Sequence, residues 1–167
     1  MRAFERRALT AGEIALGQGI FGAAVRWPRV RVAQAPWGPF GAMVPLGETI
    51  WFGAWRAPND FSLATRAAQG WLIHELAHVW QAARGVVLPV AKLGALTRAA
   101  YAVRHAPDKR FKDHNIEAQA EIARLLFLAR EGVDTVPERD VLETLWAEAL
   151  HQRFPAERRE SRDPGQM

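Results

Sequence analysis

Two histidines and a glutamate form an H-E-x-x-H motif at His74, Glu75 and His78. Residues four apart lie on one face of a helix, so both imidazoles project the same way and can hold one metal ion. Glu75 lies beside them at the angle needed to reach a water bound to that ion. The motif therefore predicts a zinc hydrolase, with Zn²⁺ as its cofactor. The alternative is a pair of polar residues lining a partly buried helix, with Glu75 paired to a nearby arginine.

The chain contains no cysteine, which restricts the third ligand of such an ion. Thiolate zinc sites, disulfides and cysteine nucleophiles are excluded, so the third ligand must be His, Glu or Asp. The best candidate is Glu117, which shares a helix face with Glu121 four residues later. Glu117 would bind the metal while Glu121 accepts the second N–H of a ligand histidine. The alternative is that these two glutamates form a solvated helix face.

The expected reaction is hydrolysis of a peptide bond. Zn²⁺ held by His74, His78 and Glu117 would polarise the scissile carbonyl and lower the pKa of its bound water. Glu75 would take the proton of that water and pass it to the leaving amine. A further donor should stabilise the oxyanion, and three residues between the two metal-binding segments are candidates. They are Tyr101, His105 and His114, although a lone tyrosine on an apolar helix can belong to the core and His114 to a helix N-terminus.

The segments Trp71–Gln81 and Asn115–Glu121 together resemble the gluzincin-type metallopeptidases, in which H-E-x-x-H is followed by a glutamate and an acidic residue on a downstream helix. The chain more closely resembles small bacterial Vgr-related proteins, akin to zincin-like domains found with contractile injection systems and polymorphic toxins. Leu9–Leu16, Arg29–Val32 and Asp60–Ser62 also look like that group, so the resemblance covers most of residues 8–131. It implies a minimal zincin-like fold. Glu121 is a departure, because many gluzincins have Asp there.

Three different functions are compatible with these residues. The first is a zinc-dependent endopeptidase that acts on a protein or peptide substrate. The second is a noncatalytic zincin-like module that binds a protein partner in a secretion or toxin apparatus, and intact Glu75 argues against it because a structural site needs no base. The third is an SprT-like, nucleic-acid-associated protease with His105 or His114 as third ligand, in which the Glu117 and Glu121 pair would lose its purpose.

The elements that position these residues fit one domain. With 167 residues, 49% of them hydrophobic, the chain can bury a core, and we expect a single zincin-like domain over residues 1–154. Residues 155–167 lack apolar content and should form a disordered tail. The net charge is +4, with a basic stretch over residues 84–112 and an acidic one over residues 113–148. We read these as two solvated faces of one domain and a nucleic-acid partner as unfavoured.

The first part of the chain predicts a small antiparallel sheet. Thr10 and Glu13 fit a capping box for a helix that ends near Phe21. Polar and apolar residues then alternate over Arg29–Gln34, a turn covers Trp37–Gly41, and apolar runs follow at Ala42–Leu46 and Thr49–Ala54. Either the first or the last of these strands is the expected edge, where an extended peptide could bind by strand addition.

Helical spacing begins beyond residue 60, so the fold class is α+β. Four helices are expected, over about residues 64–84, over about 90–105, from a cap at Asp113 to Glu131, and from Pro137 with an apolar stripe to Ala149. Trp71 and Trp80 flank the motif and should wall the site and lock its helix.

The N-terminal residues and the apolar runs indicate where the protein is expected to be located. The charged N-terminus is followed by no apolar segment of the kind a secretory signal needs. The run from Val86 to Leu96 contains Pro89 and Lys92 and is too short to span a bilayer. We therefore expect a cytoplasmic protein without membrane contact, which would leave the cell only through a specialised secretion machine.

Overall fold

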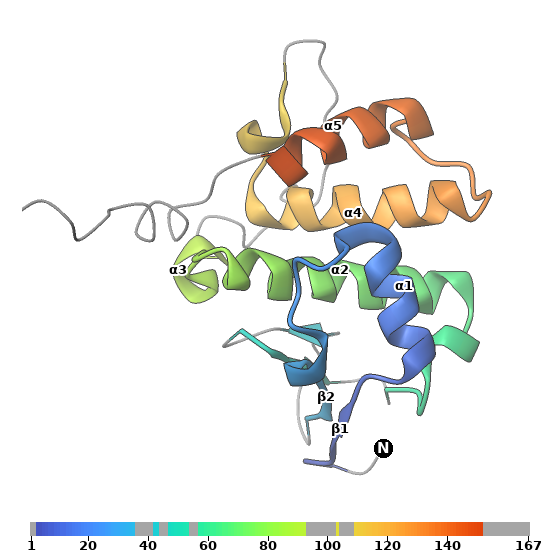
Figure 1. Ribbon diagram of the computed structural model, residues 1–167, viewed down its shortest axis with the longest axis vertical. Coiled ribbons are helices and arrows are strands. Elements are labelled where there is room, and N and C mark those ends of the chain that lie inside the picture. Colours follow the sequence, from blue (N-terminus) through green and yellow to red (C-terminus); the bar gives the residue numbers. More distant parts are fainter. Residues whose placement is uncertain are drawn as a thin grey trace, which may run out of the picture.

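A computed structural model describes residues 3–35, 42–43, 47–53, 57–92, 103 and 109–151 (Figure 1). A sheet forms near the N-terminus and long helices follow, which confirms the α+β class. In chain order the regular elements are β1 (Arg6–Ala8), α1 (Ala11–Phe21), β2 (Arg31–Gln34), β3 (Ala42–Met43), β4 (Thr49–Phe52), α2 (Arg66–Ala83), α3 (Leu88–Lys92), α4 (Ile116–Arg130) and α5 (Arg139–His151). Short 3-10 helices lie at Trp27–Arg29, Phe61–Leu63 and Phe111–Asp113.

The sheet is mixed rather than wholly antiparallel, which corrects the sequence prediction. Its strand order is β1-β2-β4-β3, and β2 pairs in parallel with β4, with Val32 opposite Ile50. The outer pairs β1–β2 and β3–β4 are antiparallel. Parallel pairing needs a crossover longer than a hairpin, and the chain between Gln34 and Thr49 provides one.

Both predicted edge strands lie inside the sheet. The strand predicted at Arg29–Gln34 begins only at Arg31, because Pro28 belongs to a 3-10 helix, and it lies between β1 and β4. The strand predicted from Thr49 lies between β2 and β3. The edges of the described sheet are β1 and β3, and β1 escaped prediction because its three residues are mostly exposed and lack an apolar alternation. Strand addition would therefore have to use one of these two short strands.

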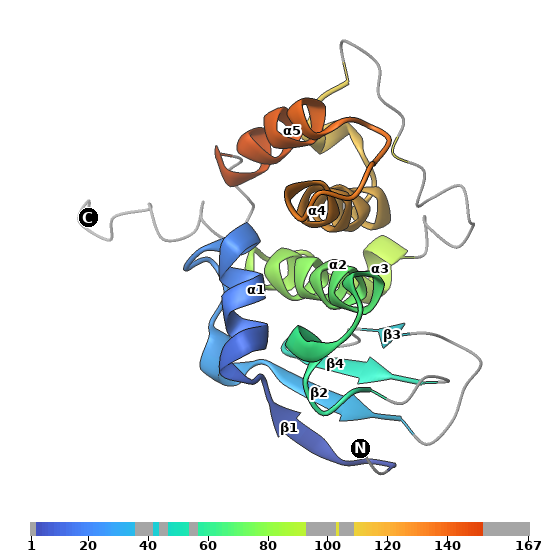
Figure 2. The same cartoon turned by 90° about the vertical axis from the view of Figure 1, so that its right-hand side faces the viewer.

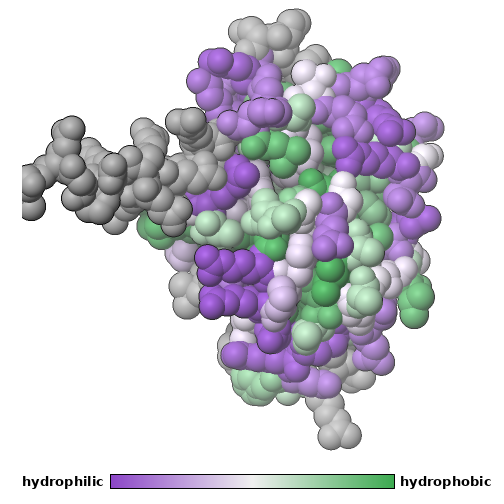
Figure 3. Space-filling view, in the orientation of Figure 1, coloured by the Kyte–Doolittle hydropathy of each residue, from purple (hydrophilic) through white to green (hydrophobic). Residues whose placement is uncertain are grey.

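The elements form layers around α2 (Figure 2). The sheet lies on one side of α2, α4 lies on the other side, and α5 covers α4. Trp80 on α2 is fully buried and packs against the aromatic rings of Phe21, Phe111 and Trp146. Trp80 thus locks the helix in the core, as expected of an aromatic residue there. On the outside, hydrophilic side chains predominate toward the rim of the face shown in Figure 3, and hydrophobic ones gather toward its middle.

Side-chain caps fix where helices α1, α2 and α4 begin. The capping box of Thr10 and Glu13 on α1 is confirmed. Thr65 caps α2, and Gly85 follows its end with a φ of 87°, a backbone conformation that favours glycine. The cap of α4 is Asn115, whose side chain accepts hydrogen bonds from two backbone N–H groups, and not the predicted Asp113. Asp113 instead ends the preceding 3-10 helix and accepts from the backbone N–H of Arg110.

Some sequence predictions fall partly or wholly outside the described residues. They are the turn at Trp37–Gly41, the ends of the strands predicted at Ala42–Leu46 and Thr49–Ala54, most of the helix predicted at about residues 90–105, and the tail at residues 155–167. The described start of the second predicted helix is α3, which begins at Leu88. Among the described residues, none of the helices is long and apolar enough to cross a membrane.

A buried carboxylate ties β1, α1 and the Phe61–Leu63 turn together. Glu13 is fully buried and forms a bidentate ion pair with Arg7, with N–O distances of 2.7 and 2.6 Å. Its oxygens also accept from the backbone N–H groups of Thr10 at 2.8 Å and Phe61 at 2.8 Å. This carboxylate therefore joins three segments of the chain.

We expect Glu13→Gln to lower the free energy of unfolding by about 3 kcal/mol, because the buried amide NH₂ group would face donors and the partly buried Arg7 would lose its charged partner. Urea denaturation followed by circular dichroism measures this change. The control is Glu143→Gln, which removes an exposed ion pair with Arg130 and should cost under about 1 kcal/mol. Equal losses in the two variants would contradict the structural role of Glu13.

Candidate metal centre

Helix α2 presents the H-E-x-x-H motif on a face that is closed to solvent. His74, Glu75 and His78 are 1%, 4% and 0% exposed. The rings of the two histidines lie 5.1 Å apart between centroids, at an interplanar angle of 85°. The helical spacing therefore brings the two imidazoles together as the sequence predicted.

Helix α4 runs antiparallel beside α2 and brings Glu117 to the two histidines (Figures 1 and 2). Oε2 of Glu117 lies 3.3 Å from Nε2 of His74 and 3.2 Å from Nε2 of His78. One ligand atom from each residue falls within 4.8 Å of the others. A tetrahedron with zinc–ligand distances of 2.0–2.2 Å has edges of about 3.4 Å, close to the two measured separations. These three buried residues could hold a metal ion.

The far nitrogens of both imidazoles also have partners. Nδ1 of His74 lies 3.4 Å from Oε2 of Glu121, and Nδ1 of His78 lies 2.9 Å from Oε1 of Gln81. An amide oxygen only accepts, so Nδ1 of His78 donates to Gln81 and Nε2 is the nitrogen that can serve as the ligand atom. Partners of this kind fix the tautomer and the ring orientation of a ligand histidine. Both Nε2 atoms consequently point at the space beside Glu117.

Gln81 is a residue that the sequence analysis did not single out. Its amide NH₂ group donates to the backbone oxygen of Ile116 at 3.0 Å and to Oε1 of Gln119 at 3.1 Å. Gln119 in turn donates to the backbone oxygen of His114 at 2.9 Å. This chain of amides links the second histidine to the start of α4. The available signal was a polar side chain three residues after His78, on the same buried side of the helix.

Carboxylates dominate the electrostatics around His74. Burial lowers the pKa of His74, but hydrogen bonds to Glu117 and Glu121 and the charge of Glu75 outweigh it and raise that pKa to about 9. Burial raises the pKa of Glu121, whereas hydrogen bonds from His74 and Arg124 act in the opposite direction and leave it below its usual range. Without an ion, His74 is therefore protonated near neutral pH and Glu121 is ionised.

We expect zinc binding to strengthen with pH between 6 and 8, because the ion must displace the proton on His74, whose pKa is raised to about 9. The apparent affinity should rise roughly tenfold per pH unit while one proton is released. Competition with a chromophoric chelator measures the slope, and calorimetry in buffers of different ionisation heat counts the protons. Glu121→Gln lacks one of the groups that raise the pKa of His74, so in this variant the zinc affinity should stop increasing at a lower pH. An affinity that is constant across this range in the wild-type protein would contradict the assignment of His74 as a ligand.

Glu75 is buried beside the three donor residues. Its Oε2 atom has no hydrogen-bond partner among the described residues, although it is shielded from solvent. A buried carboxylate oxygen without a partner is costly, so a polar ligand or water is expected there. The donor set and this oxygen together fit a zinc ion with a bound water.

Of the three candidates for the oxyanion donor, the structure describes only His114. Tyr101 and His105 lie outside the described residues. His114 is 5% exposed and directly precedes Asn115, the cap of α4. It does not belong to the group of donor atoms formed by His74, His78 and Glu117. Its role as a catalytic donor stays a prediction.

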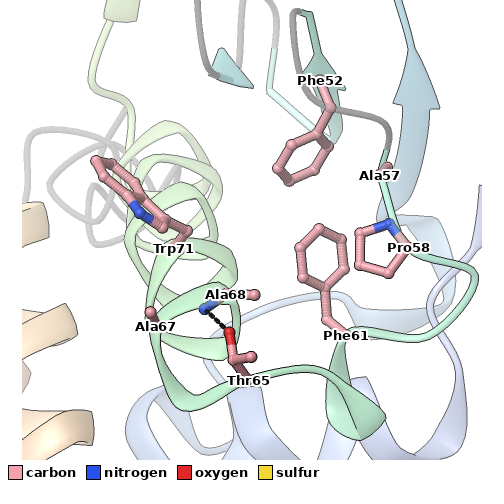
Figure 4. A pocket seen from close by; sticks show the side chains of 8 residues that line it. All are labelled: Phe52, Ala57, Pro58, Phe61, Thr65, Ala67, Ala68 and Trp71. Carbon is pink, nitrogen blue, oxygen red and sulfur yellow. Dashed lines mark hydrogen bonds between the residues drawn. The ribbon is translucent and has the colours of Figure 1, made fainter.

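An apolar pocket of about 380 Å³ adjoins the centre along α2 (Figure 4). The rings of Phe52 and Phe61 face the first turns of the helix across this pocket, and Trp71 lies at its other side. The Trp71 ring is also 5.7 Å from the ring of His74. Trp71 therefore borders both the pocket and the metal centre, which agrees with the expectation that it walls the site.

Comparisons with known proteins place the chain in a family. No family model matches it. It is 40% identical over 136 residues to the type VI secretion system spike protein VgrG2b of Pseudomonas aeruginosa, a match that covers 74% of this chain and 13% of the spike protein. The solved effector domain of Pseudomonas aeruginosa VgrG2b is 30% identical, with a TM-score of 0.63, and the match covers 88% of this chain and 83% of that domain. The chain therefore belongs to the family of the VgrG2b effector domain.

Proposed function

We propose that this chain is an effector module of a bacterial secretion system that hydrolyses peptide bonds with a zinc ion held by His74, His78 and Glu117. The observation that carries the proposal is the buried donor group together with Glu75, which shares a helix with the two histidines and whose Oε2 has no hydrogen-bond partner in the described part of the chain. Membership of the VgrG2b effector family supports the link to a secretion system. The protein partner would then belong to that apparatus, and the substrate would be a protein or peptide.

The residues of the chain would divide the reaction between them. When bound, zinc supplies a Lewis acid that polarises the carbonyl and acidifies a water. Glu75 takes the proton of that water and later delivers it to the leaving nitrogen. Glu121 and Gln81 hold the two imidazoles at fixed angles through their Nδ1 atoms. The apolar pocket beside Trp71 supports a peptide substrate, because it offers space for an apolar side chain.

A second candidate is a noncatalytic module that binds a partner in the secretion apparatus and uses metal only for structure. The matches to a spike protein and to an effector domain favour a role in such an apparatus whether or not the site is active. Glu75 separates the two candidates, since a structural site is usually closed by four protein ligands and has no use for a free carboxylate. The SprT-like alternative with His114 is disfavoured because, among the residues that the structure describes, Glu117 and not His114 joins the two histidines in the donor group.

The test combines metal content with cleavage. We expect the purified protein to hold one zinc ion per chain and to cleave members of a diverse peptide library, with the products identified by mass spectrometry. A chelator should abolish cleavage and added zinc should restore it. Bound zinc without any cleavage would favour the binding module, and the absence of stoichiometric zinc would contradict both forms of the metal centre.

A further inference from the structure

Arg124 closes a ring of contacts around His74. Its guanidinium forms two hydrogen bonds with the carboxylate of Glu121, Nε to Oε2 at 2.8 Å and a terminal nitrogen to Oε1 at 2.6 Å. Oε2 of Glu121 is also the atom that lies 3.4 Å from Nδ1 of His74. One oxygen of Glu121 thus lies between Nε of Arg124 and Nδ1 of His74.

The bidentate pair determines how the Glu121 carboxylate is held. A planar guanidinium with two parallel N–H groups fixes the plane of a carboxylate as well as its position. A glutamate without such a partner samples several rotamers, and restricting them costs conformational entropy. Arg124 therefore reduces the freedom of the group that faces His74.

Helix α2 provides the surface on which Arg124 lies. A Cβ atom at Gly70 would come within 3.3 Å of Cγ of Arg124, so the arginine stem passes over a position that has no side chain. The guanidinium carbon lies 5.5 Å from the centre of the Trp71 ring, within the range of a cation–π contact. The same ring lies 5.7 Å from that of His74. Trp71 consequently contacts both ends of the path from Arg124 through Glu121 to His74.

We propose that Arg124 is a positioning residue of the metal centre, which acts through Glu121 to hold the His74 imidazole with Nδ1–H toward Glu121 and Nε2 toward the ion. The inference rests on the proposed metal centre and adds a residue that never touches the ion. The formal charges agree with it. A divalent cation and Arg124 together carry three positive charges, which balance the carboxylates of Glu75, Glu117 and Glu121.

The test measures zinc affinity by competition with a chromophoric chelator. We expect Arg124→Gln to weaken binding about tenfold, in the range found for groups that orient metal ligands, and Arg124→Lys to restore only part of it. The matched control is Arg130→Gln, which removes a similar bidentate pair with Glu143 at the C-terminal end of the same helix and should leave zinc affinity unchanged.

Two further measurements separate positioning from a merely structural role. Histidine ¹⁵N spectra of the zinc-bound protein should change at His74 in Arg124→Gln and stay the same at His78. In a Glu121→Gln background, Arg124→Gln should cause no additional loss of affinity. Full additivity in that background, or unchanged affinity in Arg124→Gln beside a wild type that binds zinc, would overturn the inference while leaving the metal centre intact. A wild type without zinc would instead overturn the proposed function, and the inference with it.

Discussion

Replacing Glu75 by glutamine should lower kcat/KM for a cleaved peptide by about 10³-fold, the middle to upper part of the range for loss of a general base. This equals roughly 4 kcal/mol of transition-state stabilisation. Glutamine keeps the size of the side chain but cannot take a proton from water. Glu75 is not one of the grouped donor residues, so zinc content and the thermal midpoint should stay at their wild-type values. Steady-state kinetics on a library-derived peptide, with metal analysis of the same sample, measures both.

The control for this variant is Glu138→Gln, the same change at an exposed position before α5. It should leave kcat/KM unchanged. A Glu75→Gln protein that binds zinc and cleaves as fast as the wild type would show that the base lies elsewhere. That result would contradict the proton transfer proposed above and leave the three ligands untouched.

Replacing Glu117 by glutamine should weaken zinc binding by more than about 100-fold. Removing a group that only hydrogen-bonds to a metal ligand already costs about 10–100-fold in metal affinity. The neutral amide loses the anionic oxygen that lies 3.3 and 3.2 Å from the two Nε2 atoms. Competition with chelators of graded affinity measures the change, and hydrolysis should fall with the metal content.

The loss of zinc affinity in Glu117→Gln can be compared with the loss in Glu121→Gln. Its side chain faces Nδ1 of His74 rather than the ion, so the loss of affinity should be smaller than in Glu117→Gln. If Glu117→Gln kept its zinc affinity, the third ligand would have to come from elsewhere. His114 or His105 would then be the next residues to change, as in the SprT-like alternative.

The parts of the site that could be predicted from sequence are those that depend on local geometry. His74 and His78 share a face because a helix repeats every 3.6 residues, and Glu117 and Glu121 share one for the same reason. The absence of cysteine narrowed the choice of a third ligand. No local rule, however, shows which face of one helix meets which face of another.

The features that escaped prediction depend on contacts between distant segments. Gln81 and Arg124 acquire their roles only because α4 packs antiparallel against α2. The parallel pairing of β2 with β4 likewise depends on the path of the chain between them, and the apolar alternation of each strand says nothing about its neighbour. Asp113 and Asn115 both suit a helix cap, and Asn115 takes that role while the side chain of Asp113 accepts from the backbone N–H of Arg110 in the 3-10 turn before it.

Gly70 touches none of the candidate ligands, yet it affects how the helices that carry them pack. Helices α2 and α4 approach across this position, where a Cβ atom would come within 3.3 Å of Arg124 and 3.4 Å of Leu128. The two histidines belong to one helix and Glu117 to the other, so the separation of the helices sets the distance from nitrogen to oxygen across the centre. The metal–ligand distances of a well-formed site lie within about 0.2 Å of their usual values. A methyl group at position 70 would need the side chains of Arg124 and Leu128 to give by a few tenths of an ångström, so the missing side chain leaves the room in which Arg124 reaches Glu121.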